Sequence, residues 1–496
     1  MSESATATAI AEPPQERAGP EAETGPDPNG WWRGPGGGRE VLAVATPMVV
    51  SSLSWTIMTF IDRMMLNHWS GDAMAAAFNA GVVWWLFVCL PLGVCSYAST
   101  FVAQYHGSGR LGRIGPVVWQ AVWVALAFSP LLLALIPMSA AMFRAAGHDE
   151  SIVALETTYF TILTYGSPAM LLSGALACFW TGRGQTVLVM VVDAVFASLN
   201  LLLDWWWIFG VTLTVGGEAW EVFPPGGVAG AAWATTTAMW AKTVVYAVLL
   251  VARRNRGELR STGWRLERGL IHRLLRFGVP SGLQWLVEVA GFTAFIVVVG
   301  RLGAVENQAT SMTFSIGHLA FMPVVGLGGA ASVLVGQHLG ENRDRAAARS
   351  TWTTLHVAWA YMVAISAAFV FAPQWFLGGF FVGEAIEGDP AERAAVAATA
   401  VVLLRFVAAY NLLDATMITV AGALKGAGDT RFVLTTSALM APLLGVGAWS
   451  AEALGAGIYG CWAVVACWIG GLAAIFFARF LGGAWRSMRV IEPEVV

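Results

Sequence analysis

Two six-residue stretches, Val102-Ala103-Gln104-Tyr105-His106-Gly107 and Val335-Gly336-Gln337-His338-Leu339-Gly340, each close a long apolar run and lie 233 residues apart. Pro47 and Pro280 have the same spacing. Further matches follow in the same order: Gly184-Gln185-Thr186 with Gly428-Asp429-Thr430, and Gly227 and Gly230 with Gly457 and Gly460. Because the matches keep their order, they predict a chain built by duplication from two related halves.

The apolar runs that surround these stretches are long enough to cross a membrane. Hydrophobic residues make up 57% of the 496 residues and charged residues only 12%, about half the share of an average soluble domain. A spanning helix needs about 20 apolar residues. We expect an all-α polytopic membrane protein with twelve spans, at 41–65, 75–103, 115–139, 154–180, 187–211, 228–251, 270–300, 308–337, 350–372, 394–423, 432–451 and 457–480.

The distribution of Lys and Arg predicts the orientation of these spans. With the N-terminus inside, 22 of the 28 basic residues fall in cytoplasmic loops and tails. The expected outer loops hold Arg63, Arg144, Arg301 and Arg393, and the spans hold Lys242 and Arg405. Because cytoplasmic loops are enriched in basic residues, we expect both termini in the cytoplasm and the protein in the cell's inner or plasma membrane.

Six spans per half give both halves the same orientation, so we expect parallel repeats with a substrate site between them. The predicted organisation is a disordered cytoplasmic tail at 1–38, an N-lobe at 39–252 and a cytoplasmic linker at 253–269. A C-lobe at 270–483 and a cytoplasmic tail at 484–496 follow. The first 30 residues show no signal peptide pattern.

Several classes of protein do not fit the composition. No basic soluble domain is present, so nucleic acid is not an expected partner. All five cysteines lie in apolar runs without metal-ligand spacing, and we interpret them as small core residues. We find no P-loop, catalytic triad or metal-binding cluster, so we expect neither an enzyme, an ATP-driven pump nor a bound cofactor. We expect a monomer in the lipid bilayer.

Polar residues inside the N-half spans are the first candidates for function. Asp62 ends the sequence Phe60-Ile61-Asp62, and Asn200 and Asp204 are four residues apart on one helix face. Buried carboxylates are costly and usually face a cavity or a partner, and their oxygens suit H⁺ or Na⁺. The structural alternatives are an ion pair of Asp62 with the adjacent Arg63 and a packing hydrogen bond for Asn200 and Asp204. Asp193 we interpret as structural.

The C-half carries a second polar set. Gln284 and Glu288 share a face of span seven, and Tyr410, Asn411 and Asp414 share a face of span ten. We expect Glu288 and Asp414 to bind the cation and Gln284, Tyr410 and Asn411 to line the substrate cavity. Arg405 could instead form an ion pair with one of the acids, and Lys242 could extend its ammonium toward the inner surface; both roles stay open.

Together these residues resemble the multidrug and toxic compound extrusion (MATE) family, in particular its NorM-like bacterial branch, from about Val41 to Leu481. The resemblance rests on an ordered set of short motifs: Thr46-Pro47 with Phe60-Ile61-Asp62, the stretch 102–107, Asn200 to Asp204 with Phe209-Gly210, Pro280 to Glu288, Phe321-Met322-Pro323 with Gly336-Gln337, and Ala421 to Gly426 with Gly428-Asp429-Thr430.

The resemblance implies two six-helix lobes around a central cavity and export of organic cations or other drugs by antiport with Na⁺ or H⁺. It places Glu288 and Asp414 in a C-lobe cation site and Asp62, Asn200 and Asp204 in an N-lobe one, so the coupling ion stays open. Arg63 beside Asp62 departs from the family pattern. The first alternative is a flippase for lipid-linked saccharides, and the second is a channel or a membrane enzyme.

Overall fold

The computed structural model describes residues 31–215, 218–381 and 390–493. Within these ranges it contains twelve spans that are long and apolar enough to cross a membrane, which confirms the expected number. The spans are α1 (Gly38–Trp69), α2 with α3 (Gly71–Ser96, Ala98–Gly107), α4 (Ile114–Leu133), α6 (Glu150–Thr181), α7 (Thr186–Phe209), α8 (Gly227–Val251), α10 (Arg268–Gly300), α11 (Ala304–Gly340), α12 (Asp344–Phe371), α14 (Pro390–Ala427), α15 (Thr430–Ala453) and α16 (Gly457–Leu481).

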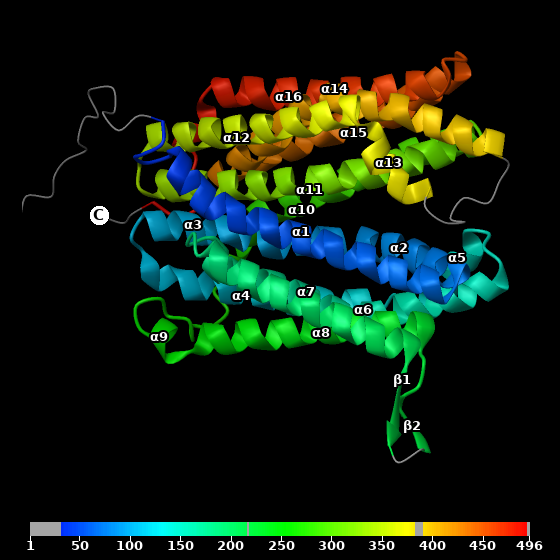
Figure 1. Ribbon diagram of the computed structural model, residues 1–496. Helices are drawn as coiled ribbons and strands as arrows, with labels where there is room; N and C mark the ends of the chain where they lie inside the picture. The colour runs from blue at the N-terminus through cyan, green and yellow to red at the C-terminus, as the bar shows by residue number, and fades with distance from the viewer. Residues whose placement is uncertain (1–30, 216–217, 382–389, 494–496) are drawn as a thin grey trace, which may run out of the picture.

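Short elements connect the spans. They are η1 (Leu111–Arg113), η2 (Ile136–Met138), α5 (Ser139–Ala145), α9 (Arg253–Arg256), α13 (Pro373–Phe381) and η3 (Ala484–Ser487). An antiparallel hairpin of β1 (Val211–Val215) and β2 (Glu218–Phe223) joins α7 to α8 and projects from the bundle (Figure 1). The sequence analysis predicted only helices and did not predict this hairpin.

Long helices form because a membrane offers no water to the backbone, so each span must satisfy its own N–H and C=O groups. Prolines nevertheless lie inside several spans, among them Pro47 in α1 and Pro280 in α10, which occupy matching positions of the two halves. Packing against neighbouring helices makes such interruptions tolerable. The repeated proline therefore belongs to the repeated fold.

The helices assemble into two packed layers that correspond to the two halves of the chain, the first blue to green and the second green to red in Figure 1. Each has its own buried apolar cluster, one containing Phe101, Phe160 and Phe179 and the other Phe295, Trp462 and Phe476. The N-terminal end of α10 is an exception, since Leu270 and Leu274 belong to the first cluster.

The two lobes contact each other along the pairs α1–α11 and α2–α10. The repeated glutamines make equivalent bonds across this interface. Gln104 Nε2 donates to the carbonyl of Gly426 at 3.0 Å, and Gln337 Nε2 donates to the carbonyl of Gly182 at 2.8 Å. Each copy of the repeated stretch therefore forms a hydrogen bond to the opposite lobe.

The glycines that end the two stretches allow this close approach. A Cβ on Gly107 would lie 2.0 Å from the carbonyl oxygen of Gln337, and one on Gly340 would lie 2.3 Å from that of Gln104. Both obstacles are backbone atoms, which cannot move aside as a flexible side chain does. The same holds where α2 meets α10: a Cβ on Gly93 would lie 2.6 Å from the Cα atom of Gly282.

These close contacts lie in the half of the bundle that also holds the first and last described residues, at the left in Figure 1. In the opposite half, large apolar side chains of the same four interface helices are exposed. Examples are Phe60 in α1, Phe78 in α2, Val297 in α10 and Leu319 in α11. The structure is thus closed between the lobes at the end that carries the termini.

The segment expected as a linker, 253–269, packs on the N-lobe helix α4. Trp119 Nε1 donates to the carbonyl of Ser261 at 2.7 Å, and Gln120 Nε2 donates to that of Arg265 at 3.0 Å. The connection between the lobes is therefore attached to one of them. Most of the expected N-terminal tail, residues 1–30, lies outside the described part of the chain.

Candidate functional site: two buried carboxylate clusters

The N-lobe cluster brings together three of the expected residues. Asp62 from α1 and Asp204 from α7 are both buried, and their carboxylates are close enough to interact electrostatically. The hydroxyl of Tyr159, from α6, lies 3.5 Å from Asp62 Oδ2. Three helices that are far apart in sequence thus supply one polar centre in an otherwise apolar lobe.

Asn200 connects this pair to α8. In the amide orientation that satisfies both neighbours, its nitrogen donates to Asp204 Oδ2 at 3.1 Å and its oxygen accepts from Thr235 Oγ1 at 3.3 Å. The Oδ1 atoms of Asp62 and Asp204 have no hydrogen-bond partner among the described residues. Buried polar atoms are normally paired, so two unpaired carboxylate oxygens in one cluster point to a bound cation.

The alternative ion pair between Asp62 and Arg63 is not formed. The Arg63 guanidinium instead lies over the ring of Phe78, 5.0 Å from its centroid. Adjacent residues on a helix point about 100° apart, so the two side chains face different neighbours. Arg63 therefore acts on Asp62 only through its charge and forms no direct ion pair with it.

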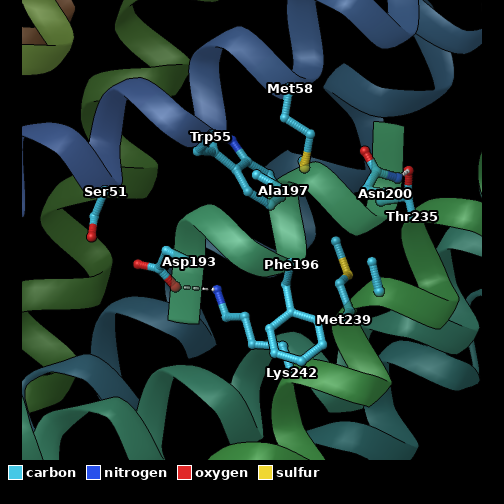
Figure 2. A pocket seen from close by; sticks show the side chains of 11 residues that line it. Ser51, Trp55, Met58, Asp193, Phe196, Ala197, Asn200, Thr235, Met239 and Lys242 are labelled. Carbon is cyan, nitrogen blue, oxygen red and sulfur yellow. Dashed lines mark hydrogen bonds and ion pairs between the residues drawn. The ribbon is translucent and has the colours of Figure 1, made fainter. Parts of the chain in front are cut away.

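A cleft between α1, α7 and α8 leads to this cluster (Figure 2). Trp55 and Phe196 supply aromatic surface in it, and Asn200 and Thr235 lie at its upper end in the view. At the other end Lys242 Nζ forms an ion pair of 2.9 Å with Asp193 Oδ1. The structural interpretation of Asp193 agrees with this pair, whereas Lys242 does not extend alone toward the surface.

The C-lobe cluster has its own hydrogen-bond network. Glu288 Oε1 accepts from Gln284 Nε2 at 2.8 Å and from Ser437 Oγ, on α15, at 3.2 Å. Gln284 Oε1 in turn accepts from Lys425 Nζ at 3.2 Å. The carboxylate of Glu288 is thereby linked through one amide to a cation that the protein itself provides.

The position of Lys425 corrects the sequence analysis, which counted it among the cytoplasmic bases and named only Lys242 and Arg405 as bases inside the membrane. Lys425 lies in the last turn of α14, but its long side chain reaches back into the C-lobe. Arg405 is exposed and forms no ion pair with any acid in the described part of the chain. Its expected alternative role as the partner of a carboxylate is therefore not observed.

Asp414 is buried and interacts electrostatically with Glu288, so the two expected C-lobe acids do meet. Tyr410 and Asn411 are buried one turn earlier on the same helix. Asn411 Nδ2 donates to Ser366 Oγ of α12 at 3.0 Å, a bond inside the lobe. Gln284 and Asn411 thus both have partners within the C-lobe.

Two buried acids, Glu156 and Asp429, were not predicted from the sequence as buried charges; Asp429 pairs with Arg479 at 2.8 Å. Glu156, in α6, is fully buried, with its carboxylate 2.8 Å from His148 Nδ1 and accepting from Asn79 Nδ2 at 2.8 Å. It lies in the second turn of α6, six residues after a sequence that is typical of a surface turn, Gly147-His148-Asp149-Glu150. Spacing alone gave no signal, because its partners come from another helix and from the preceding loop.

Twelve spans in two repeated lobes, with a carboxylate cluster buried in each, define a membrane protein of the secondary-transporter class. The MatE family profile matches residues 47–206 and 280–448 of this chain. The chain belongs to the MatE family, and it is a multi-pass membrane protein.

Named relatives agree with this assignment. The chain is 29% identical over 395 residues to a probable multidrug resistance protein NorM of Xanthomonas axonopodis pv. citri, covering 78% of this chain and 81% of the relative. It is 28% identical over 401 residues to the multidrug resistance protein PmpM of Pseudomonas aeruginosa, covering 80% of each. The solved outward-facing structure of a multidrug resistance MATE family transporter superposes with a TM-score of 0.80 at 18% identity, over 92% of this chain and 98% of that one.

Proposed function

We propose that this protein is a secondary active transporter that exports organic cations and other drugs from the cell by antiport with Na⁺ or H⁺. The observation that carries the proposal is the pair of buried carboxylates Asp62 and Asp204, whose Oδ1 atoms lack partners. The family and the named multidrug resistance relatives support the export of drugs.

The N-lobe cluster is the better candidate for the coupling ion. Two adjacent carboxylates in an apolar lobe repel each other unless a cation balances them. No Lys or Arg forms an ion pair with either of them in the described ranges, and Asn200 and Tyr159 bring neutral groups only. We infer that a proton or a sodium ion balances this charge. Because Asp62 lies on α1 and Asp204 on α7, a movement of α1 relative to α7 changes the affinity for that cation.

The C-lobe cluster differs because the ammonium of Lys425 already lies beside it. Glu288 accepts two neutral hydrogen bonds, and Lys425 balances part of its charge through Gln284. We infer that Glu288 and Asp414 together hold about one uncompensated negative charge. Because less negative charge needs to be balanced here than in the N-lobe, we assign this cluster a secondary role, either in cation binding or in attracting a cationic substrate.

We place both termini in the cytoplasm, from the distribution of basic residues. The end at which the lobes are closed is then the cytoplasmic end, and the structure is that of an outward-facing transporter. The exposed apolar side chains of α1, α2, α10 and α11 in the outer half fit this state. Antiport follows if the ion and the drug each bind one of the two states better than the other. Binding of the ion from outside then favours the state that releases the drug.

The substrate would use the cleft between α1, α7 and α8. Trp55 and Phe196 offer ring faces to flat cations, an interaction worth about 0.5–2 kcal/mol each. The drug and the ion would then compete for neighbouring groups, since Asn200 belongs both to the cleft and to the carboxylate cluster. Such competition is the simplest physical basis of exchange.

The decisive experiment measures ethidium efflux from a pump-deficient host that expresses the protein. We expect efflux by the wild type, and loss of at least about tenfold in Asp62→Asn and Asp204→Asn at equal membrane expression, because neither variant can exchange a cation normally. Asp72→Asn is the control, since Asp72 is exposed at the start of α2 and does not line the cleft. Unchanged accumulation across a broad panel of cationic drugs would refute the drug-export proposal.

A second measurement identifies the ion. In inverted membrane vesicles, we would vary Na⁺ at fixed pH and then impose a pH gradient without Na⁺. Drug movement driven by only one of the two gradients assigns the ion. Drug transport that responds to neither gradient contradicts antiport with either cation.

We infer transport rather than catalysis, since the polar groups of both lobes form ion pairs and hydrogen-bond networks without an activated nucleophile. A flippase for lipid-linked saccharides remains the alternative. Its cargo is anionic, so it would require a basic cavity, and the single base in the cleft, Lys242, is paired with Asp193. Failure of drug export together with flipping of a fluorescent lipid-linked saccharide in vesicles would favour the flippase.

A further inference from the structure

The C-terminal segment after η3 returns across the closed end of the bundle and contacts both lobes. Its Glu492 carboxylate accepts from the hydroxyl of Tyr105, on α3, at 2.7 Å and pairs with Arg113 of η1 at 3.4 Å. The same carboxylate pairs with Arg273, on α10. Arg110 Nη2 donates to the Glu492 carbonyl at 2.8 Å. One residue thus joins two helical segments of the N-lobe to the first helix of the C-lobe.

Neighbouring residues fix this segment in place. Val490 and Ile491 are buried and belong to the N-lobe apolar cluster, although they follow the last helix of the C-lobe. The backbone N–H of Val490 donates to Gln104 Oε1 at 2.8 Å, so the glutamine that clasps Gly426 also holds the tail. The segment therefore docks at the interface between the lobes, on the same residue that closes it.

The internal repeat shows why a carboxylate is needed at this place. At the α1–α11 contact, Glu40 lies 3.5 Å from His338 Nε2. The duplication spacing of 233 residues places Arg273 at the position of Glu40, and Tyr105 at that of His338. Where α10 meets α3, Arg273 therefore stands at the position that Glu40 occupies where α1 meets α11.

Without a further acid, Arg273 would face the two N-lobe arginines Arg110 and Arg113, although Glu267 also pairs with Arg113 at 2.9 Å. Glu492 supplies the missing negative charge. Burial raises the pKa of the Glu492 carboxyl, but the hydrogen bond from Tyr105 and the charges of Arg113 and Arg273 lower it more, so the net pKa is below the ordinary value. The group stays ionised at cytoplasmic pH.

We propose that Glu492 is a gate-positioning residue that holds the cytoplasmic ends of the two lobes together and must leave the arginine cluster before the transporter can open inward. The proposal rests on the alternation between outward- and inward-open states in the proposed function. It predicts that Glu492 sets the balance between those states without touching the drug or the coupling ion.

The test measures the distance between the inner ends of the lobes in the full-length protein by double electron–electron resonance. Spin labels are attached at Val187→Cys, at the exposed start of α7, and Arg431→Cys, at the exposed start of α15. The background carries Cys467→Ser, because Cys467 is exposed whereas the other four cysteines are buried. The wild type should show mainly the short distance of the closed end.

Glu492→Gln should raise the ratio of long to short distances about tenfold, the effect expected when a charge-assisted hydrogen bond is lost. Adding Arg273→Gln should restore much of the short distance by removing the repulsion. The matched control is Arg486→Gln in the same tail, since Arg486 pairs with Asp344 of its own lobe, at 3.7 Å, and with no acid of the N-lobe in the part of the chain that the structure describes. This control should leave the distances unchanged.

Two results would overturn the proposal: the same distance distribution in Glu492→Gln as in the wild type, or an equal shift in Arg486→Gln. Neither result depends on drug export, since the distances are measured without substrate. A distance shift in a protein that exports no drug would support the gate and contradict the proposed function instead. Unshifted distances in Glu492→Gln together with full ethidium efflux would contradict the gate and support the proposed function.

Discussion

The close approach of Gly340 to the other lobe offers the sharpest prediction, because its outcome follows from backbone geometry. Gly340 of α11 faces the backbone of α3, and an added Cβ would lie 2.3 Å from the carbonyl oxygen of Gln104 and 3.0 Å from the amide nitrogen of Ser108. Nonbonded carbon and oxygen atoms approach to about 3.3 Å. Gly340→Ala therefore requires a separation of about 1 Å at this point.

The two helices belong to different lobes, so separating the lobes relieves the clash with less distortion than bending either helix. Such overpacking costs about 1–3 kcal/mol, and the loss of the Gln104–Gly426 bond adds about 0.5–1.5 kcal/mol. A penalty of about 2 kcal/mol on the closed state corresponds to a shift of about thirtyfold in the conformational equilibrium. The variant should fold but populate much less the state in which the lobes are closed at the end that carries the termini.

The assay follows alkylation of a cysteine placed at Thr100, a buried residue of α3 beside Gly336 of α11, in intact cells and in inverted vesicles, together with ethidium efflux. The background carries Cys467→Ser, because Cys467 is exposed. We expect Gly340→Ala to increase the alkylation rate from the cytoplasmic side about tenfold or more and to reduce efflux. Gly81→Ala is the control, because its added Cβ meets no atom within 4 Å. If Gly340→Ala and Gly81→Ala show equal alkylation and efflux, the geometric argument is refuted.

Three further predictions concern buried charges, each measured as the melting temperature of purified protein in detergent. Lys425→Met should destabilise the fold by about 1–3 kcal/mol, and adding Glu288→Gln should recover most of the loss; two additive losses would contradict the shared network. Lys242→Met should be destabilising alone but close to neutral when combined with Asp193→Leu, since a half-buried pair is replaced by apolar packing. Glu156→Gln should cost about 1–3 kcal/mol by weakening its bond with a histidine, whereas no change at acidic or neutral pH would show that the pairing contributes nothing.

The sequence predicted much of the candidate site because helical spacing is a local property. Asn200 and Asp204 are one turn apart on α7, and the structure bonds them directly. Gln284 and Glu288 repeat this arrangement on α10. Bonds within one helix can be inferred from spacing alone, since every residue four positions on lies on the same face.

Partners on other helices could not be inferred in the same way. The sequence placed Lys425 in a cytoplasmic end because it follows an apolar run, yet its side chain returns to Gln284. It also gave no reason to connect Asp62 with Tyr159, which lies 97 residues away in the chain. Such contacts depend on the crossing of helices, and hydropathy carries no information about that crossing.

By itself, then, the sequence determined twelve spans, their duplication and most of the acids they bury, because transfer into a membrane is governed by the composition of each segment alone. Only the tertiary structure decided that Gln104 and Gln337 clasp opposite lobes, that Asp62 meets Asp204, and that Glu492 fills the charge missing from one half of the repeat. These are contacts between segments that insert independently. The geometry of these contacts is set by how the helices pack against one another, and this packing cannot be inferred from any single segment of the sequence.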